Sequence, residues 1–104
     1  MPRLLTDEEI ERQLGELPAW ARDGEQIRAV FDAPDFPTAV ALVAEVAAEA
    51  EDLDHHPDID IRWRTTTWVL STHSEGGLTQ LDIELAHRIS RIADHLKATA
   101  QTHG

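Results

Sequence analysis

The sequence of 104 residues contains no cysteine, which excludes disulfides and thiol chemistry and suits a reducing, cytoplasmic location. Basic residues are also few: there are 9, against 20 acidic residues, which gives a net charge of −11. That balance argues against binding to nucleic acid or to an anionic membrane surface, because a basic patch supplies most of the affinity for both. We therefore expect neither a nucleic acid nor a membrane as a partner.

Long apolar runs are absent too, and none approaches the ~20 residues that a membrane-spanning helix needs. The N-terminal stretch turns acidic at Asp7, which is not the pattern of a signal peptide. Hydrophobic residues make up 41% of the chain and charged residues 28%, as in a folded globular protein. A chain of this length is expected to form one domain over residues 1–104, with a modest core.

Two stretches in the first half of the chain have the features of helices. Thr6 is followed three residues later by Glu9, the spacing of a capping box, and the helix it begins should end near Gly15. The alanine-rich run Asp35–Leu53 begins with a capping aspartate and has Pro37 in its first turn. Its apolar residues recur at helical spacing, which predicts a long amphipathic helix.

The strand signals occur in two pairs. Two short runs flank the turn Asp23–Gly24, a strong hairpin signal. After a proline, residues 58–63 alternate between apolar and polar side chains, and residues 65–73 are rich in β-branched residues. The stretch Thr79–Ala100 then begins with a second capping pair and carries the apolar stripe of a final helix.

The order helix, two strands, helix, two strands, helix predicts an α+β fold, with a four-stranded antiparallel sheet and three helices packed on one face. The long helix has a broader apolar arc than one core face requires. One possibility is that Val40, Val43 and Ala47 face the core while Ala39, Leu42 and Val46 meet a partner subunit. The other possibility is the reverse. We expect a homodimer through edge-strand pairing, or a homotetramer if the long helices also pack together.

Three histidines lie at the ends of predicted elements. His55 and His56 follow the long helix, and His73 ends a strand just before the turn into the last helix. Asp82, in the first turn of that helix, should lie near His73. Glu51 precedes His55 by four residues, so these two share a face if helical geometry persists. A carboxylate beside an imidazole can hold it in one tautomer.

Three interpretations of this histidine group are open. One is a polar turn with a capping histidine. Another is a metal site of three histidines and a carboxylate, although spaced ligands such as H-x-H or H-x-x-x-H serve a metal better than adjacent histidines do. The third is metal-free acid–base chemistry, in which each proton transfer is worth ~10²–10⁴-fold in rate. The remaining histidines, His87, His95 and His103, are expected to be solvated.

The same region resembles a known family. The stretch EDLDHHP has the form E-x-x-x-H-H-P, Trp63 stands six residues after Pro57, and LSTHSEGGLTQLD supplies a T-H pair, a glycine-containing turn and an aspartate. Together with LPAW and VFDAPDF upstream, these motifs are similar to the pterin-4a-carbinolamine dehydratase family, over about residues 4 to 98. The resemblance implies the same α+β fold of four antiparallel strands and three helices.

The resemblance also implies an activity: dehydration of a 4a-hydroxytetrahydropterin to quinonoid dihydropterin and water, as in tetrahydrobiopterin recycling, without a metal or other cofactor. By resemblance, the residues that carry the proton transfers are His55, His56 and His73. Those that orient or bind the pterin substrate are Glu51, Thr72, Asp82 and Trp20, the last of which could equally anchor the hairpin in the core.

Two further tryptophans, Trp63 and Trp68, are interpreted as mainly structural. Two alternatives to the dehydratase remain. One is a non-catalytic module that binds a pterin or another protein, because the vertebrate branch of the family also serves as a dimerisation cofactor of a transcription factor. The other is a related enzyme that acts on a different pterin.

Overall fold

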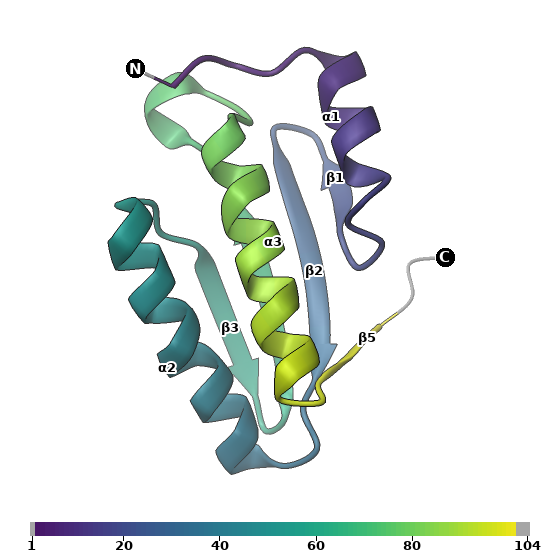
Figure 1. Cartoon of the computed structure of the whole chain (residues 1–104), viewed down its shortest axis with the longest axis vertical. Helices are drawn as coiled ribbons and strands as arrows, with labels where there is room; N and C mark the ends of the chain where they lie inside the picture. Colours follow the sequence, from purple (N-terminus) through teal and green to yellow (C-terminus); the bar gives the residue numbers. More distant parts are fainter. Residues whose placement is uncertain (1, 102–104) are drawn as a thin grey trace.

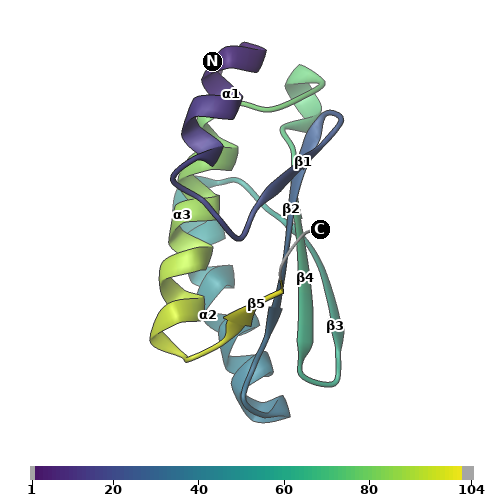
Figure 2. The same cartoon turned by 90° about the vertical axis from the view of Figure 1, so that its right-hand side faces the viewer.

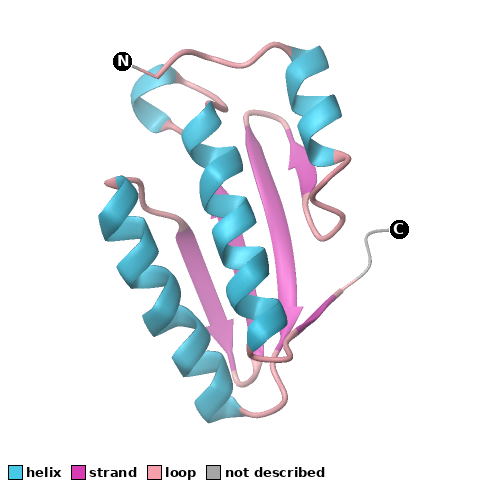
Figure 3. Cartoon of the chain, viewed as in Figure 1, coloured by secondary structure: helices cyan, strands magenta, loops and turns pink. Residues whose placement is uncertain are grey.

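The computed structural model describes residues 2–101 and consists of three α-helices, a short 3₁₀ helix and one antiparallel sheet (Figures 1 and 3). In chain order the elements are α1 (Asp7–Leu14), β1 (Ala21–Asp23), β2 (Gln26–Asp32), α2 (Phe36–Leu53), β3 (Asp58–Arg62), β4 (Thr65–Leu70), η1 (His73–Glu75), α3 (Gln80–His95) and β5 (Thr99–Ala100). The predicted α+β class and the predicted order of helices and strand pairs are confirmed.

The sheet has one strand more than the sequence predicted. The main path through the sheet is β1-β2-β4-β3. Strand β1 pairs with the first half of β2, and β5 pairs with the last two residues of β2 along the same edge. The stretch predicted as one helix through Ala100 therefore divides. Helix α3 ends at His95, Lys97 adopts a left-handed conformation with φ of 62°, and the chain turns back so that the Gln101 N–H donates to the Val30 carbonyl.

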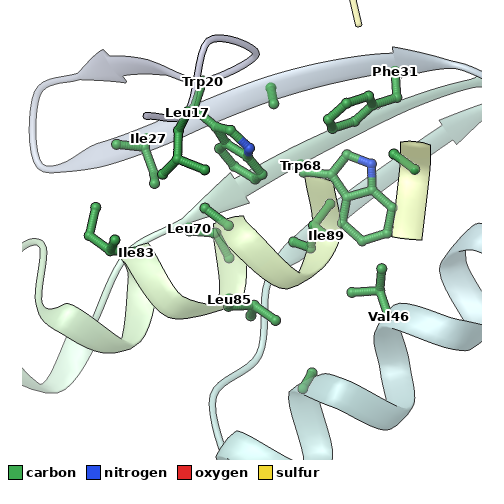
Figure 4. Close-up of a cluster of buried hydrophobic side chains, with 14 of the residues drawn as sticks. Leu17, Trp20, Ile27, Phe31, Val46, Trp68, Leu70, Ile83, Leu85 and Ile89 are labelled. Atoms are coloured by element: carbon green, nitrogen blue, oxygen red, sulfur yellow. The ribbon is translucent and has the colours of Figure 1, made fainter. Parts of the chain in front are cut away.

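All three helices cover one face of the sheet, as Figure 2 shows from the side. The core lies between these layers, because alternate side chains of the central strands point toward the helices. Figure 4 shows this cluster, in which Ile27, Phe31, Trp68 and Leu70 of the sheet meet side chains of α2 and α3, including Ile89. Trp68 is a structural residue, as predicted: it is fully buried, and its indole N–H donates to Thr66 Oγ1.

Helix α2 presents two different apolar stripes, and the structure decides between the two predicted alternatives. Its buried, core-facing residues are Ala39, Leu42, Val46 and Ala50. The second stripe faces away from the core, and there Phe36 is 49% exposed and Val40 is 47% exposed. Of the other set, Val40 and Ala47 are exposed, whereas Val43 is half-buried and packs against the edge of the core.

Trp63 differs from its prediction, because it contributes nothing to the core of the chain. It lies in the two-residue turn between β3 and β4, where it is 72% exposed and has a φ of 54°. Positive φ is unusual for a bulky side chain and carries strain. Its ring instead stacks under the guanidinium of Arg64, which lies 5.1 Å from the ring centroid.

Candidate functional site

The end of α2 sends two adjacent histidines in different directions. The helix ends at Leu53. Its capping residue, Asp54, adopts a left-handed conformation with φ of 50°, and the His55 N–H then donates to the Ala50 carbonyl. Aspartate tolerates this conformation better than most residues do. The reversal leaves His55 buried, while His56, the residue before Pro57, is exposed.

The buried member of the pair contacts the first turn of α3. His55 Nε2 lies 2.5 Å from Asp82 Oδ1, and the Asp82 side chain is completely buried. Asp82 is held there by its place in the helix, because it is the third residue of α3 and forms the predicted capping box with Thr79. A carboxylate and an imidazole thus meet inside the protein, at the junction of the helix ends.

The second oxygen of Asp82 accepts two hydrogen bonds. The Thr72 hydroxyl donates to Oδ2 over 2.8 Å, and the Thr79 backbone N–H donates to the same oxygen over 2.9 Å. Because the Thr72 proton is directed to Asp82, the proton between Thr72 and Thr79, whose hydroxyl oxygens are 2.8 Å apart, must belong to Thr79. Every hydroxyl in this buried chain therefore donates toward the carboxylate.

The contact with Asp82 limits which nitrogen of His55 can carry a single proton. When Asp82 is a carboxylate it can only accept hydrogen bonds, so His55 donates to Oδ1 from Nε2–H. A neutral imidazole that donates from Nε2 has no proton on Nδ1. Among residues 2–101, no buried side-chain nitrogen or oxygen lacks a hydrogen-bond partner, so the unbonded Nδ1 of His55 is reached by solvent.

A second histidine–carboxylate pair lies next to the first, at the surface. His56 Nε2 bonds Glu51 Oε2, and the two side chains are 58% and 75% exposed. The sequence had suggested the opposite pairing, with Glu51 beside His55 and Asp82 beside His73. The pairing of Glu51 with His55 is wrong, because the left-handed Asp54 interrupts the helical spacing between them. Asp82 bonds His55 and also Thr72, the residue before His73.

The third histidine enters the same region from the strand side. His73 is exposed and begins the 3₁₀ helix η1. It directly follows Thr72, whose side chain is buried against Asp82. The sequence identified Thr79 only as a helix cap. A signal for its contact with Thr72 was nevertheless present, because the two threonines are seven residues apart and flank a glycine-containing turn.

An ion-pair cluster fixes the end of α2 against α3. Arg88 of α3 donates to Asp52 over 2.7 Å and to Glu49 over 3.1 Å, and it also bonds Glu84 within its own helix. The hydrogen bonds to Asp52 and Glu84 raise the pKa of Arg88 above its usual value. Because Glu49 and Asp52 belong to the last turns of α2, this cluster helps to place the residues that follow.

Trp20 does not join the histidines. It is 4% exposed, lies in the core, and its indole N–H donates to Ser90 Oγ, more than two helical turns along α3 from Asp82. Its position supports the role of an anchor for the first hairpin in the core, rather than a role in binding the pterin. His87 is half-buried rather than fully solvated, His95 is exposed, and His103 lies outside the described residues.

Four hollows in the described part of the chain lie away from the three histidines. In the described part of the chain, four surface hollows of about 390 to 430 Å³ are lined by other residues, and none of these four includes His55, His56 or His73. Within residues 2–101, no group of three or more histidine, aspartate or glutamate side chains is arranged to hold a metal ion. In the same range, no helix is both long enough and apolar enough to cross a membrane.

The family profile named pterin 4 alpha carbinolamine dehydratase matches residues 3–92, which include all the residues of this site. The chain belongs to this family. A protein of Nocardia farcinica is 56% identical over 90 residues, covering 86% of this chain and 95% of the relative. One of Roseiflexus castenholzii is 54% identical over 92 residues, covering 88% and 99%. Both are named provisionally as pterin-4-alpha-carbinolamine dehydratases.

Two solved structures have the same fold. A Brucella melitensis protein described as a transcriptional coactivator/pterin dehydratase superposes with a TM-score of 0.83 at 38% identity, covering 86% of this chain and 97% of that one. A pterin dehydratase-like protein, described as a RuBisCO assembly factor in the α-carboxysome, superposes with a TM-score of 0.63 at 19% identity, covering 72% and 89%. The second similarity concerns the fold alone.

Proposed function

We propose that this chain dehydrates a 4a-hydroxytetrahydropterin to the quinonoid dihydropterin and water, in the recycling of a tetrahydrobiopterin-type cofactor. The observation that carries the proposal is the buried Asp82–His55 pair, which leaves His55 Nδ1 free at the surface next to the His56–Glu51 pair. Membership of the pterin carbinolamine dehydratase family supports the choice of substrate class.

The reaction requires one proton to be delivered and one to be removed. An acid protonates the hydroxyl on carbon 4a, the C–O bond breaks and water leaves. The lone pair of the neighbouring ring nitrogen forms the new C=N bond, and a base takes the N–H proton. His55 serves as the base in this proposal, because a neutral imidazole that donates from Nε2 to Asp82 has no proton on Nδ1. His56 or His73, each exposed and next in sequence to a residue of the buried network, supplies the acid, and solvent exchange restores the starting protonation.

The carboxylates and the threonine have supporting roles in this proposal. Asp82 orients His55, and Glu51 orients His56. Thr72 acts through Asp82 rather than on the pterin, because its hydroxyl is buried and donates to that carboxylate. Trp20 receives no substrate contact here, since its indole lies in the core.

The mechanism predicts that chelators do not change turnover. The protein, dialysed against EDTA and assayed in metal-free buffer, should convert the substrate at the rate of the untreated sample. Metal analysis of the purified protein is the accompanying control. Stoichiometric zinc, together with loss of activity on its removal, would replace the metal-free mechanism by a metal-activated one.

The exposed stripe of α2 supports the proposed homo-oligomer. Val40→Glu should lower the mass measured by light scattering, because it places a carboxylate where the long helices of two copies would meet. The matched control is Ala48→Glu, an exposed position about 80° round the same helix. Equal masses for Val40→Glu and the wild type would show that α2 is not an interface, and a wild-type mass of 11.6 kDa would refute the oligomer.

A non-catalytic interaction module is the second candidate function. The same exposed stripe favours it, as does the description of the Brucella neighbour, which includes a transcriptional coactivator. One experiment separates the candidates: stopped-flow absorbance of a synthetic 4a-hydroxytetrahydropterin with and without the purified protein. Acceleration over the spontaneous reaction supports the enzyme, and pterin binding without acceleration supports the module. Repeating it with other 4a-hydroxypterins tests the substrate class.

A further inference from the structure

Helices α1 and α3 begin with the same capping motif, but their capping threonines have different surroundings. Thr6 precedes α1, is exposed, and its hydroxyl oxygen accepts from the Glu9 N–H over 3.2 Å. Thr79 precedes α3, is completely buried, and its hydroxyl oxygen accepts from the Leu81 N–H over 3.3 Å. A helix cap requires only such an acceptor. The hydroxyl proton of a capping threonine can therefore serve another partner.

The proton of Thr79 has such a partner inside the protein. The hydroxyl oxygens of Thr79 and Thr72 lie 2.8 Å apart, and both side chains are at most 5% exposed. Thr72 donates its own proton to Asp82 Oδ2, so the proton between the two threonines comes from Thr79. In the reverse direction the Thr79 proton would have no acceptor among the contacts of that hydroxyl, because the Leu81 N–H is a donor. The direction of donation is thus fixed.

A row of hydrogen bonds therefore runs from the start of α3 to His55. The Leu81 N–H donates to Thr79, Thr79 donates to Thr72, and Thr72 donates to Asp82. The other oxygen of Asp82 lies 2.5 Å from His55 Nε2, and none of the four side chains in this row is more than 8% exposed. Hydrogen bonds in series polarise one another in such a low-dielectric environment. A change at Thr79 should therefore reach His55, although two side chains lie between them.

We propose that Thr79 is a positioning residue of the histidine site. Its hydroxyl donates to Thr72, which keeps the Thr72 proton on Asp82 and so keeps the single ring proton of neutral His55 on Nε2. The inference rests on the proposed dehydration for the reaction that it assists. It adds to that proposal a residue that acts on the base through two other side chains.

The hydroxyl of Thr79 leaves Thr72 with one acceptor for its proton. Thr72 has a single hydroxyl proton and two oxygens within reach, Thr79 Oγ1 and Asp82 Oδ2, each 2.8 Å away. While Thr79 donates to Thr72, the proton of Thr72 can go only to Asp82. The two bonds together also hold the Thr72 side chain in the rotamer that places its oxygen between these partners.

Asp82 depends on these donors because its side chain is completely buried. Burial disfavours a charged carboxylate, and hydrogen bonds donated to the carboxylate offset that cost. With Thr72 and the Thr79 N–H bonded to Oδ2, Asp82 remains an acceptor to which His55 donates. A protonated Asp82 would instead donate to His55 Nε2, and the ring proton would move to Nδ1. The nitrogen assigned to the base would then carry a proton.

The effect of Thr79 is expected in kcat rather than in KM. Thr79→Val keeps the outline of the side chain and removes the hydroxyl. It should lower kcat about three- to tenfold, as expected for one hydrogen bond of the row, and leave KM unchanged. Thr79→Ser keeps both the cap and the donor and should retain the wild-type kcat. A wild-type kcat in Thr79→Val, or an equal loss in Thr79→Ser, would refute the proposal.

The loss of the helix cap has to be separated from the loss of the donor. Thr6→Val is the matched control, because it removes the same type of cap from α1 and no member of the row. It should lower the melting temperature, as Thr79→Val does, without changing kcat. If Thr79→Val does not fold, Thr79→Gly replaces it, since glycine at this position costs little stability, and it should show the same loss of kcat. A loss in Thr6→Val equal to that at Thr79 would show that capping alone affects the rate, against the proposal.

A double-mutant cycle tests whether the two threonines act in series. Thr72→Val removes the hydroxyl that contacts Asp82, so the addition of Thr79→Val should lower kcat no further. If the two losses multiply instead, Thr79 acts independently of Thr72 and the proposed row does not exist in solution.

Nitrogen-15 NMR of the His55 ring gives a readout that does not depend on activity. Under conditions in which the ring is neutral, the wild type and Thr79→Ser should carry the proton on Nε2. Thr79→Val should show a larger share of the form protonated on Nδ1. The same His55 spectrum in all three proteins would overturn the inference even if the protein dehydrates pterins. The expected spectra from a wild type that leaves the pterin unchanged would refute only the proposed function.

Discussion

Replacing His55 with alanine is expected to lower kcat/KM for pterin dehydration at least ~100-fold, the lower end of what a proton-transfer group contributes. His73→Ala should cause a loss of the same order. The reason is that His55 presents an unprotonated Nδ1 to the surface and His73 lies exposed beside the same buried network. Circular dichroism should show that both variants remain folded, because neither side chain belongs to the hydrophobic core.

His95→Ala is the control for these variants, since His95 is exposed near the other end of α3 and touches none of the site residues described above. It should leave the rate unchanged. Rates near wild type in both His55→Ala and His73→Ala would remove the catalytic assignment. A loss in His95→Ala comparable to theirs would show that the site lies elsewhere.

Asp82→Asn is expected to cost at least ~100-fold in kcat while preserving the shape of the site. Thr72 and the Thr79 N–H donate to one side-chain oxygen, so the asparagine must place its carbonyl there and its NH₂ group toward His55. That group is a donor, so His55 Nε2 must accept, and the ring proton moves to Nδ1. The nitrogen that faces the substrate is then no longer a base.

Nitrogen-15 NMR of the His55 ring measures this tautomer directly, and stopped-flow kinetics measures its consequence. Asp94→Asn is the matched control, because Asp94 is an exposed carboxylate near the other end of α3 and is none of the site residues described above. It should retain the wild-type rate. A flipped His55 tautomer in Asp82→Asn with an unchanged kcat would show that Nδ1 does not act as the base.

The sequence predicted those parts of the fold that depend on local chemistry. The capping pairs Thr6–Glu9 and Thr79–Asp82 begin α1 and α3, and the turn at Gly24 forms the first hairpin. Each of these signals involves residues within three or four positions of one another, and backbone geometry alone determines their outcome. The order of helices and strand pairs along the chain, and the packing of the helices on one face of the sheet, followed from connecting such elements.

The pairing of histidines with carboxylates could not be predicted in the same way. It depends on Asp54, whose left-handed conformation turns His55 inward and leaves His56 to Glu51. Helical spacing pointed to the other pairing, because nothing in the local sequence shows whether a helix continues for one more residue. The partner of Asp82 likewise depends on how two helix ends meet in space.

Questions about which face is buried also required the structure. Both stripes of α2 have helical spacing and similar residues, and only packing against α3 and the sheet shows that Leu42 is buried while Val40 is exposed. The burial of Trp20 and Trp63 likewise could not be predicted from the sequence. One is buried against Ser90, the other exposed on a strained turn, and the types of their neighbours in the sequence do not distinguish them.

The central claim is that a histidine held by the buried Asp82 removes a proton from a 4a-hydroxytetrahydropterin. It is tested most directly by the rate at which this substrate disappears with wild-type protein, with His55→Ala, and without protein. The expected result is a clear acceleration by the wild type that His55→Ala reduces at least ~100-fold. A wild-type rate equal to that of the spontaneous reaction, or an equal rate for wild type and His55→Ala, would contradict it.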